Sequence, residues 1–247
     1  MPRLPKRPQA AAARKRAGGK SDGGLSKEVI LAEAIRLIDQ EGAQSFSVRS
    51  LAKALNVYPT AIYWHIPNRQ ALVAEVITTV LRDLVPPGEL DWRSWLKALF
   101  ARYRNIIREH PNIAPLIGVQ LVSNATVDLQ LIESLLEKLY DAGFSGERLV
   151  AAYNTVIGGM VGFATQEFAI VPPDVFELQE MMARSVLEAP ADRFPHLHEN
   201  APRLLNRAFI LRWENGATAP MESGFELYAD ALIAGLDALR VRGSPNV

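Results

Sequence analysis

The stretch SVRSLAKALNVYPTAIYWHIPNRQAL, residues 47–72, decides the fold of the N-terminal part of this chain. Its apolar residues form two short helical groups separated at Asn56, and Asn accepts a left-handed backbone at modest cost. Pro59 suits the first turn of the second helix, where its missing N–H is not needed, and Pro67 ends that helix. A helix, a tight turn and a short helix rich in hydroxyls and aromatics predict a helix-turn-helix, whose second helix lies in the major groove of DNA.

Three consecutive bulky residues, Tyr63, Trp64 and His65, support this interpretation. The alternative is an ordinary helical hairpin with all three side chains in its core. Successive residues of a helix point about 100° apart, so three in a row cannot all face one core. At least one must be exposed, and exposed aromatic residues of this kind call for a binding partner.

The run A-I-Y-W-H-I-x-N-R-x-A-L, residues 61–72, closely resembles the recognition helix and the following helix start of the tetracycline-repressor (TetR) family. The specific resemblance covers roughly residues 26–85, about a quarter of the chain. Asn56 stands where relatives usually have Gly, and Tyr58-Pro59-Thr60-Ala61 replaces the Glu-Gln-Pro-Thr of the family archetype. The base-reading positions therefore differ, and the operator of that archetype does not transfer to this chain.

The resemblance implies that Tyr63 and His65 bind phosphates and that the start of the recognition helix approaches bases. Methyl groups on Thr60 and Ala61 suit contact with thymine. Arg49 can reach guanine with two hydrogen bonds, or it can serve a phosphate or a surface ion pair instead. The residues expected to contact DNA are Arg49, Pro59, Thr60, Ala61, Tyr63, Trp64, His65 and Arg69.

Helical periodicity continues through the rest of the chain, with no alternating strand pattern or hairpin signal, so the predicted class is all-α. The breaker Pro86-Pro87-Gly88 predicts a boundary between a helix-turn-helix domain, residues 26–86, and a C-terminal helical ligand-binding and dimerisation bundle, residues 87–247. A loop or short turn is expected at residues 190–202. The expected helices are residues 26–42, 47–55, 59–65, 68–84, 91–109, 124–140, 146–169, 174–189, 203–213 and 220–240.

Composition narrows the compartment and the chemistry. The 247 residues are 49% apolar and 22% charged and include no cysteine, which excludes disulfides and thiolate metal sites. No uncharged apolar run reaches the roughly 18 residues of a membrane helix, and the basic N-terminus lacks the apolar segment of a secretory signal. The sequence therefore predicts a cytoplasmic protein without a membrane partner.

The net charge of zero hides an uneven distribution. Residues 1–27 hold eight basic residues and one acid, Asp22, which leaves an excess of seven positive charges. Low hydrophobicity with Pro, Gly and Ala predicts a disordered basic arm over residues 1–25. Such an arm attracts DNA phosphates, although a merely solubilising tail is the alternative.

Gly158, Gly159 and Gly162 lie within an expected helix, where each costs about 1 kcal/mol relative to Ala. Gly158 and Gly162 share one face, so a second backbone can approach closely there. The partner on that face is a second subunit or, alternatively, another helix of the same chain. A homodimer is expected independently, because two recognition helices double the length of DNA that is read.

The resemblance also implies a C-terminal domain that binds a small molecule. Aromatic residues and adaptable Met residues at helical spacing can line an apolar cavity with one polar anchor, although each is more often a core residue. His196 and His198 are a poor metal-ligand set, so no metal or cofactor is expected. The candidate pocket residues are Trp95, Phe100, Tyr103, Met160, Phe163 and Gln166.

These features predict a dimeric, sequence-specific DNA-binding transcriptional regulator, a repressor released from its operator by a small-molecule ligand. The alternative is a DNA-binding activator or an architectural protein without a ligand. A helical enzyme is disfavoured, because no nucleophile–base pair, phosphate loop or metal motif is readable.

The charge distribution yields a test of the basic arm. Deleting residues 1–24 should flatten the dependence of log K on log salt for DNA binding, by about 0.9 for each phosphate that the arm no longer neutralises. Preference for the operator over random DNA should survive, because base-reading residues such as Arg49 and Trp64 remain. If the arm instead enters the minor groove, the deletion also weakens selectivity at flanking A·T pairs. Fluorescence anisotropy over a salt series measures both quantities, and an unchanged slope would show a merely solvated tail.

Overall fold

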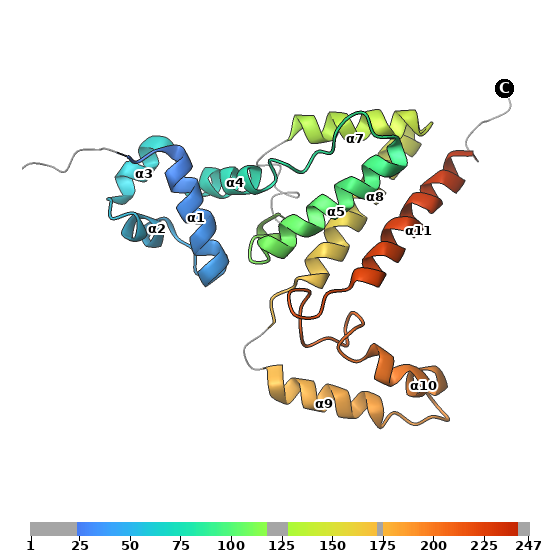
Figure 1. Cartoon of the computed structure of the whole chain (residues 1–247). Coiled ribbons are helices and arrows are strands. Elements are labelled where there is room, and N and C mark those ends of the chain that lie inside the picture. Colours follow the sequence, from blue (N-terminus) through green and yellow to red (C-terminus); the bar gives the residue numbers. More distant parts are fainter. Residues whose placement is uncertain (1–23, 118–127, 172–174, 242–247) are drawn as a thin grey trace, which may run out of the picture.

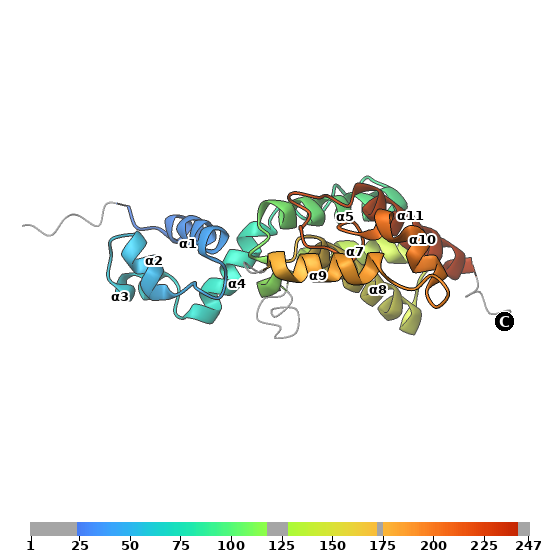
Figure 2. The ribbon, with the colours of Figure 1, turned by 90° about the horizontal axis from the view of Figure 1, so that it is seen from below.

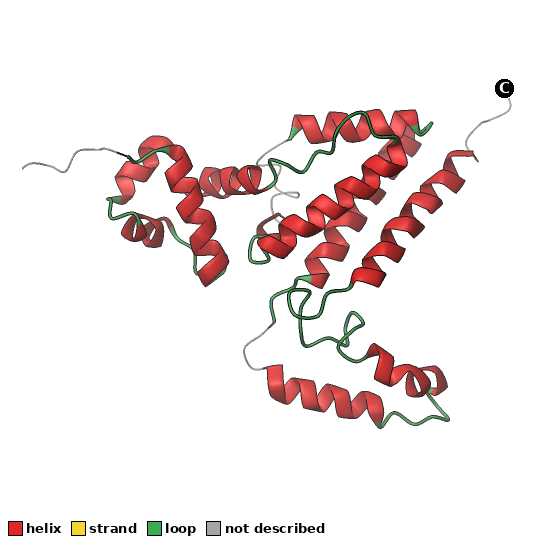
Figure 3. Cartoon of the chain, in the orientation of Figure 1, coloured by secondary structure: helices red, strands yellow, loops and turns green. Residues whose placement is uncertain are grey.

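The computed structural model describes residues 24–117, 128–171 and 175–241, and nearly all of the predicted basic arm lies outside them. Helices and loops make up the whole described part of the chain, which confirms the all-α class (Figure 3). In Figure 1, α1 to α4 form a group at one end, and the longer C-terminal helices form a bundle beside it. Helices α9 and α10 extend away from that bundle.

The N-terminal group is built by local sequence signals. Its helices are α1 (Lys27–Glu41), α2 (Val48–Ala54), α3 (Pro59–His65) and α4 (Arg69–Val80). Ser26 caps α1, Ser47 caps α2 and Asn68 caps α4, each accepting a hydrogen bond from a backbone N–H of the first turn. Fully or nearly buried apolar residues then hold the helices together: Ile30, Ala34, Ile38, Leu51, Ala52, Ile62, Leu72 and Val76.

The tight turn between α2 and α3 has the predicted left-handed residue. Asn56 adopts φ 53°, and the N–H of Val57 donates to the carbonyl of Ala52 at 2.9 Å. Pro59 is the first residue of α3, as predicted. The helix-turn-helix expected from residues 47–72 is therefore confirmed. Helix α4 ends at Val80 rather than near Leu84, because the backbone closes into turns from Leu81 onward.

The bundle consists of α5 (Trp92–Glu109), α7 (Leu129–Asp141), α8 (Gly146–Glu167) and α11 (Glu222–Val241). Helices α5 and α8 each contact the other three helices of the bundle, which Figures 1 and 2 show side by side. Its buried face is the broad apolar stripe seen in the sequence. The buried residues that fill this core include Trp95, Leu99, Phe100, Tyr103, Leu135, Leu139, Val156 and Met160.

The expectation for residues 190–213 is wrong for most of the segment. Residues 190–202 were expected to form a loop or short turn; residues 190–194 do so, but α10 spans Pro195–Leu204 and packs on α9 (Val175–Leu187). Pro195 starts α10, where a proline is tolerated. The expected helix at 203–213 is absent because Asn206 and Ile210 adopt φ 59° and 73°, which an α-helix cannot contain.

A buried ion pair joins the helices of the bundle. Arg104 of α5 donates from Nε and Nη2 to the two carboxylate oxygens of Glu167, at 2.7 Å each, and both side chains are nearly fully buried. Arg104 Nη1 also reaches Glu222 of α11 at 2.5 Å. Burial alone would lower the pKa of Arg104, but its two carboxylate partners raise that pKa above the ordinary value. Arg104 therefore remains charged and ties α8 and α11 to α5.

The ion pair yields a stability prediction. Arg104→Met should lower the free energy of unfolding by about 3–5 kcal/mol, because Glu167 is then left buried without its charged partner. Arg108→Met is the matched control, since Arg108 pairs with Glu222 from a side chain that is 39% exposed, and it should change stability by less than about 1 kcal/mol. Urea denaturation at fixed protein concentration measures both values. Equal losses would contradict a special role for the buried pair.

Candidate DNA-binding surface and ligand site

The outer face of α3 is a solvent-exposed aromatic surface. Only Ile62 (1% exposed) and Ile66 (2% exposed) anchor this short segment to the core. Trp64 is 89% exposed and Tyr63 is 45% exposed, although large aromatic residues are usually buried. Two buried anchors therefore suffice to present the rest of the helix to a partner.

The predicted DNA contacts come from three elements. Arg49 lies in the first turn of α2, Arg69 is the first residue of α4, and both are exposed. On α3, Thr60 and His65 are exposed, whereas Pro59 and Ala61 are partly buried. Figures 1 and 2 place α2 and α3 at the end of the molecule away from α11. The exposed members of this set are therefore accessible on the described part of the chain.

Tyr58 belongs to the same surface and was not among the predicted contacts. It is the N-cap residue of α3 and is 82% exposed. The available signal was its position directly before Pro59, at the start of the predicted recognition helix. Exposed aromatic residues on both sides of Pro59 extend the surface by one residue toward α2.

Three polar contacts hold this domain together and fasten it to the bundle. Lys27 of α1 pairs with Glu75 of α4 at 2.6 Å. At the other end of α1, Asp39 accepts a contact from His110 Nδ1 at 2.8 Å, and its carbonyl accepts from Asn112 Nδ2 at 2.8 Å. His110 and Asn112 lie within three residues of the end of α5, so the α1–α4 group is fastened to α5.

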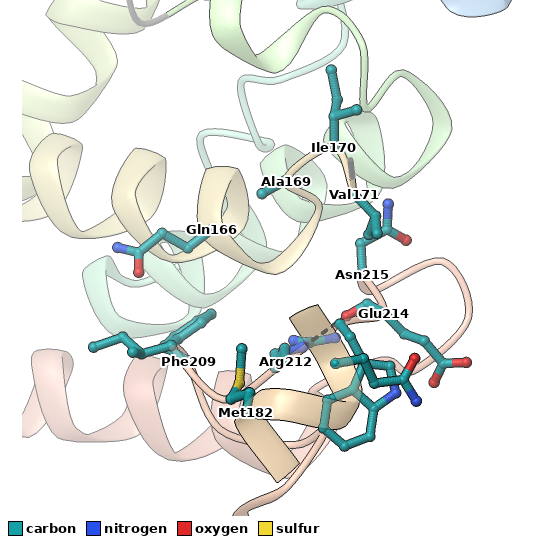
Figure 4. Close-up of a pocket in the computed structure, with 12 residues that line it drawn as sticks. Gln166, Ala169, Ile170, Val171, Met182, Phe209, Arg212, Glu214 and Asn215 are labelled. Carbon is teal, nitrogen blue, oxygen red and sulfur yellow. Dashed lines mark hydrogen bonds between the residues drawn. The ribbon is translucent and has the colours of Figure 1, made fainter. Parts of the chain in front are cut away.

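A cavity of about 310 Å³ lies at the C-terminal end of α8, between α9 and residues 209–215 (Figure 4). Its lining is mainly apolar and aromatic, with a few polar groups, as is usual for small-molecule sites. The residues that line it include Gln166, Ile170, Met182, Phe209, Arg212 and Trp213.

One of the six predicted pocket residues, Gln166, lines this cavity. Trp95, Phe100, Tyr103 and Met160 are packed in the bundle core instead. Phe163 stacks on Tyr228 with ring centroids 5.1 Å apart. A ligand role for these five residues stays a prediction. Sequence reasoning missed Phe209, Arg212 and Trp213, because residues this far along the chain meet Gln166 only in the folded protein.

Gly158, Gly159 and Gly162 of α8 face two directions. Gly159 faces α11 so closely that an added Cβ would collide with Tyr228. At Gly158 and Gly162, an added Cβ would meet no described atom within 4 Å. The same open side of α8 borders a groove of about 270 Å³ against α11, whose lining includes Ala151, Thr155, Ala231, Gly235 and Leu239.

Metal ligation and membrane insertion find no support in the described residues. Across residues 24–117, 128–171 and 175–241, no three His, Asp or Glu side chains gather as a metal site. His196 and His198 are exposed on α10. Within the same ranges, no helix combines the length and apolarity needed to cross a membrane.

The sequence matches two family profiles in chain order. Residues 30–76 match "Bacterial regulatory proteins, tetR family", and residues 86–240 match "Tetracyclin repressor-like, C-terminal domain". The chain belongs to the TetR family. It is therefore a DNA-binding transcriptional regulator and not an enzyme. The profile matches cover both the helix-turn-helix and most of the bundle.

Individual relatives agree with this assignment. The class C tetracycline repressor of Escherichia coli is 28% identical over 88% of this chain and 93% of its own length. The class G repressor of Vibrio anguillarum is 28% identical over 87% of this chain and 95% of its own length.

Solved structures share the fold. The TetR regulator SCO7222 of Streptomyces coelicolor superimposes with a TM-score of 0.68 at 22% identity, covering 88% of this chain and all of its own. ActR of the same organism, in complex with actinorhodin, gives a TM-score of 0.64 at 21% identity, covering 87% of this chain and 99% of its own. BioQ with its double-stranded DNA operator gives 0.55 at 28% identity, covering 64% of this chain and 95% of its own.

The exposed surface yields a DNA-binding prediction. Replacing Tyr63 or His65 with Ala should weaken operator binding by about 1–2 kcal/mol each, because each variant lacks a hydrogen bond to phosphate. Neither change should alter the melting temperature, because both side chains are exposed. Tyr140→Ala on α7 is the control for removal of an exposed tyrosine (59%) outside this surface. Anisotropy titrations should show unchanged affinity for the control, and a folded double variant with full affinity would refute the assignment.

Proposed function

We propose that this protein is a homodimeric repressor that binds a DNA operator through α2 and α3 and leaves it when a small molecule occupies the bundle. The observation that carries the proposal is that one chain has both an exposed Trp64 on α3 and a mainly apolar cavity at the end of α8. The operator complex of BioQ and the actinorhodin complex of ActR, both relatives in fold, support each half of it.

In operator recognition, one set of residues binds phosphates and positions the protein, and another set contacts bases and reads the sequence. Tyr63, His65 and Arg69 hold phosphates, and the amide groups at the N-terminus of α4 favour the same anions. Thr60, Ala61 and Trp64 face bases in the major groove, and Arg49 adds a guanine or phosphate contact from α2. Since Tyr58 and Pro59 alter the start of α3, the operator sequence is particular to this protein.

Ligand binding reaches the DNA surface through polar connections that the structure contains. Gln166 in the cavity wall precedes Glu167, which is paired with Arg104 of α5. Beyond the end of α5, His110 and Asn112 hold Asp39 of α1. A ligand that shifts α8 therefore moves α5 and α1, and so changes the spacing of two recognition helices in a dimer.

The proposed function also assigns a role to each domain and a place to the subunit interface. We assign residues 26–86 to the DNA-binding domain and residues 87–247 to the regulatory and dimerisation domain. The subunits meet on the open side of α8 and α11, where Gly158 and Gly162 let a second backbone approach closely. A protein that regulates transcription in this way acts in the cytoplasm.

Two linked measurements test the repressor function. Selection of bound fragments from random DNA should yield a two-fold symmetric operator with half-sites about one helical turn apart. A screen of small molecules against that complex should then find compounds that release it. An operator without symmetry contradicts the dimer, and an operator complex that no ligand releases favours an activator or architectural protein.

The dimer surface yields a prediction with a built-in control. Gly158→Leu or Gly162→Leu should give a folded monomer, because the new side chain occupies space that the partner backbone needs. Gly159→Ala should instead lower the melting temperature while leaving the protein dimeric, because its Cβ meets Tyr228 of the same chain.

Sedimentation velocity measures the oligomeric state of these variants, and circular dichroism measures their folding. A Gly162→Leu variant that stays dimeric with native stability would place the subunit interface elsewhere.

A further inference from the structure

The guanidinium of Arg212 is held rigidly at the cavity wall by backbone carbonyls. Its Nε donates to the carbonyl of Glu214 at 3.1 Å, and its Nη2 donates to the carbonyl of Ala219 at 2.5 Å. These two bonds fix the plane of the group without supplying an opposite charge. Figure 4 shows Arg212 beside Met182, with Gln166 and Phe209 around the same space.

The third nitrogen of Arg212 lacks a hydrogen-bond partner. Nη1 is buried, and no acceptor within the described ranges reaches it. Burial lowers the pKa of Arg212, while the charges of Glu167 and Glu214 act to raise it. A buried donor on a charged group is costly when it is left unsatisfied, so such a group in a native protein usually has a partner, which can be a water, an ion or a ligand.

The neighbouring carboxylates are already engaged. Both oxygens of Glu167 accept from Arg104, and one also accepts from the N–H of Met221. Glu214 Oε2 accepts from Asn206 Nδ2. Neither carboxylate hydrogen-bonds Arg212, although the charges of both act on it and Glu214 itself lines the cavity.

The remaining walls determine what such a molecule must be. Phe209, Trp213 and Met182 offer aromatic and polarisable surface, and Ile170 adds an aliphatic one, while Gln179, Glu214 and Asn215 add polar groups to the lining. A volume of about 310 Å³ is that of a small drug-like ligand. An apolar ring system therefore fits the walls, and an acceptor of negative charge fits Arg212.

We propose that the cavity binds an aromatic small molecule carrying an anionic oxygen group, a carboxylate or sulfonate, which accepts a hydrogen bond from Arg212 Nη1. Gln166, which lines the same cavity, supplies a second polar contact. This inference rests on the proposed function, because it names the chemical class of the molecule that releases the operator.

Two probes of one ring system test the charge requirement on the full-length protein. Anilinonaphthalene sulfonate carries the anionic group, and N-phenylnaphthylamine lacks it; both fluoresce when they leave water. The sulfonate should bind at least tenfold more tightly than the neutral probe, as expected for a hydrogen bond to a buried charge. Equal affinities, or tighter binding of the neutral probe, would overturn the proposal.

Variants locate the effect. Arg212→Gln should weaken sulfonate binding about tenfold or more and leave the neutral probe within twofold, whereas Arg207→Gln, an exposed arginine of the same segment, should change neither. Met182→Trp should block both probes by filling the cavity. Loss of both probes in a folded Arg212→Gln variant would show a purely structural arginine. Undiminished sulfonate binding in either Arg212→Gln or Met182→Trp would place the site elsewhere.

A second substitution covers a folding failure of Arg212→Gln. Arg212→Lys keeps the charge and should retain part of the preference for the sulfonate, and loss of all preference in that folded variant contradicts the proposal. Operator binding is measured on the same preparations. Release of the operator by uncharged compounds alone would overturn the anionic ligand class and leave the repressor function standing.

Discussion

The ion pair between Arg104 and Glu167 is the constraint on which the regulatory part of this molecule depends. Glu167 is the last residue of α8, where the helix dipole disfavours a carboxylate, and its side chain has no exposed surface. Only a partner with two parallel donors makes that position tolerable, and Arg104 supplies it from α5. The carbonyl of Glu167 also accepts from Gly216 at 2.7 Å, and a side chain at Gly216 would collide with Glu167 and Phe168. One residue therefore positions α8, α5 and the segment that borders the cavity.

The DNA-binding end, unlike the buried ion pair of the bundle, presents exposed side chains on a short helix. Ile62 and Ile66 are the buried anchors of α3, and the surface around them is exposed. Burial of two isoleucines contributes roughly 3–6 kcal/mol at most, so the position of α3 depends on α1, α2 and α4. Because Asp39 in turn depends on His110, the orientation of this small domain is set by residues of the bundle. A regulator needs such a connection, since a rigidly independent DNA-binding domain could not respond to a ligand.

Residues that act through their neighbours in sequence were predictable, and residues that act across the fold were not. Ser26, Asn56, Pro59 and Asn68 mark caps and a turn by their own backbone preferences, so the helix-turn-helix was correct to within a residue or two. Residues 190–213 were misassigned because Pro195 and Pro202 resemble loop signals although α10 accommodates both, while Asn206 and Ile210 break a segment of helical composition. Arg104 and Glu167 are 63 residues apart, and no local pattern indicates their pairing. The prediction of the cavity lining was incomplete for the same reason, since Arg212 and Trp213 come close to Gln166 only in the folded protein.

The central claim is that the ligand-binding bundle sets the spacing of two recognition helices. The chain has no cysteine, so a single Gln44→Cys substitution in the exposed turn after α1 allows one spin label per subunit. Pulsed electron–electron double resonance then measures the distance between the two labels of a dimer. The distance is measured in the free protein, on the selected operator and after release by an effector. We expect one narrow distance on the operator and a different mean distance once the effector is bound. A distance that stays the same in all three states, or no inter-subunit distance at all, would contradict the account.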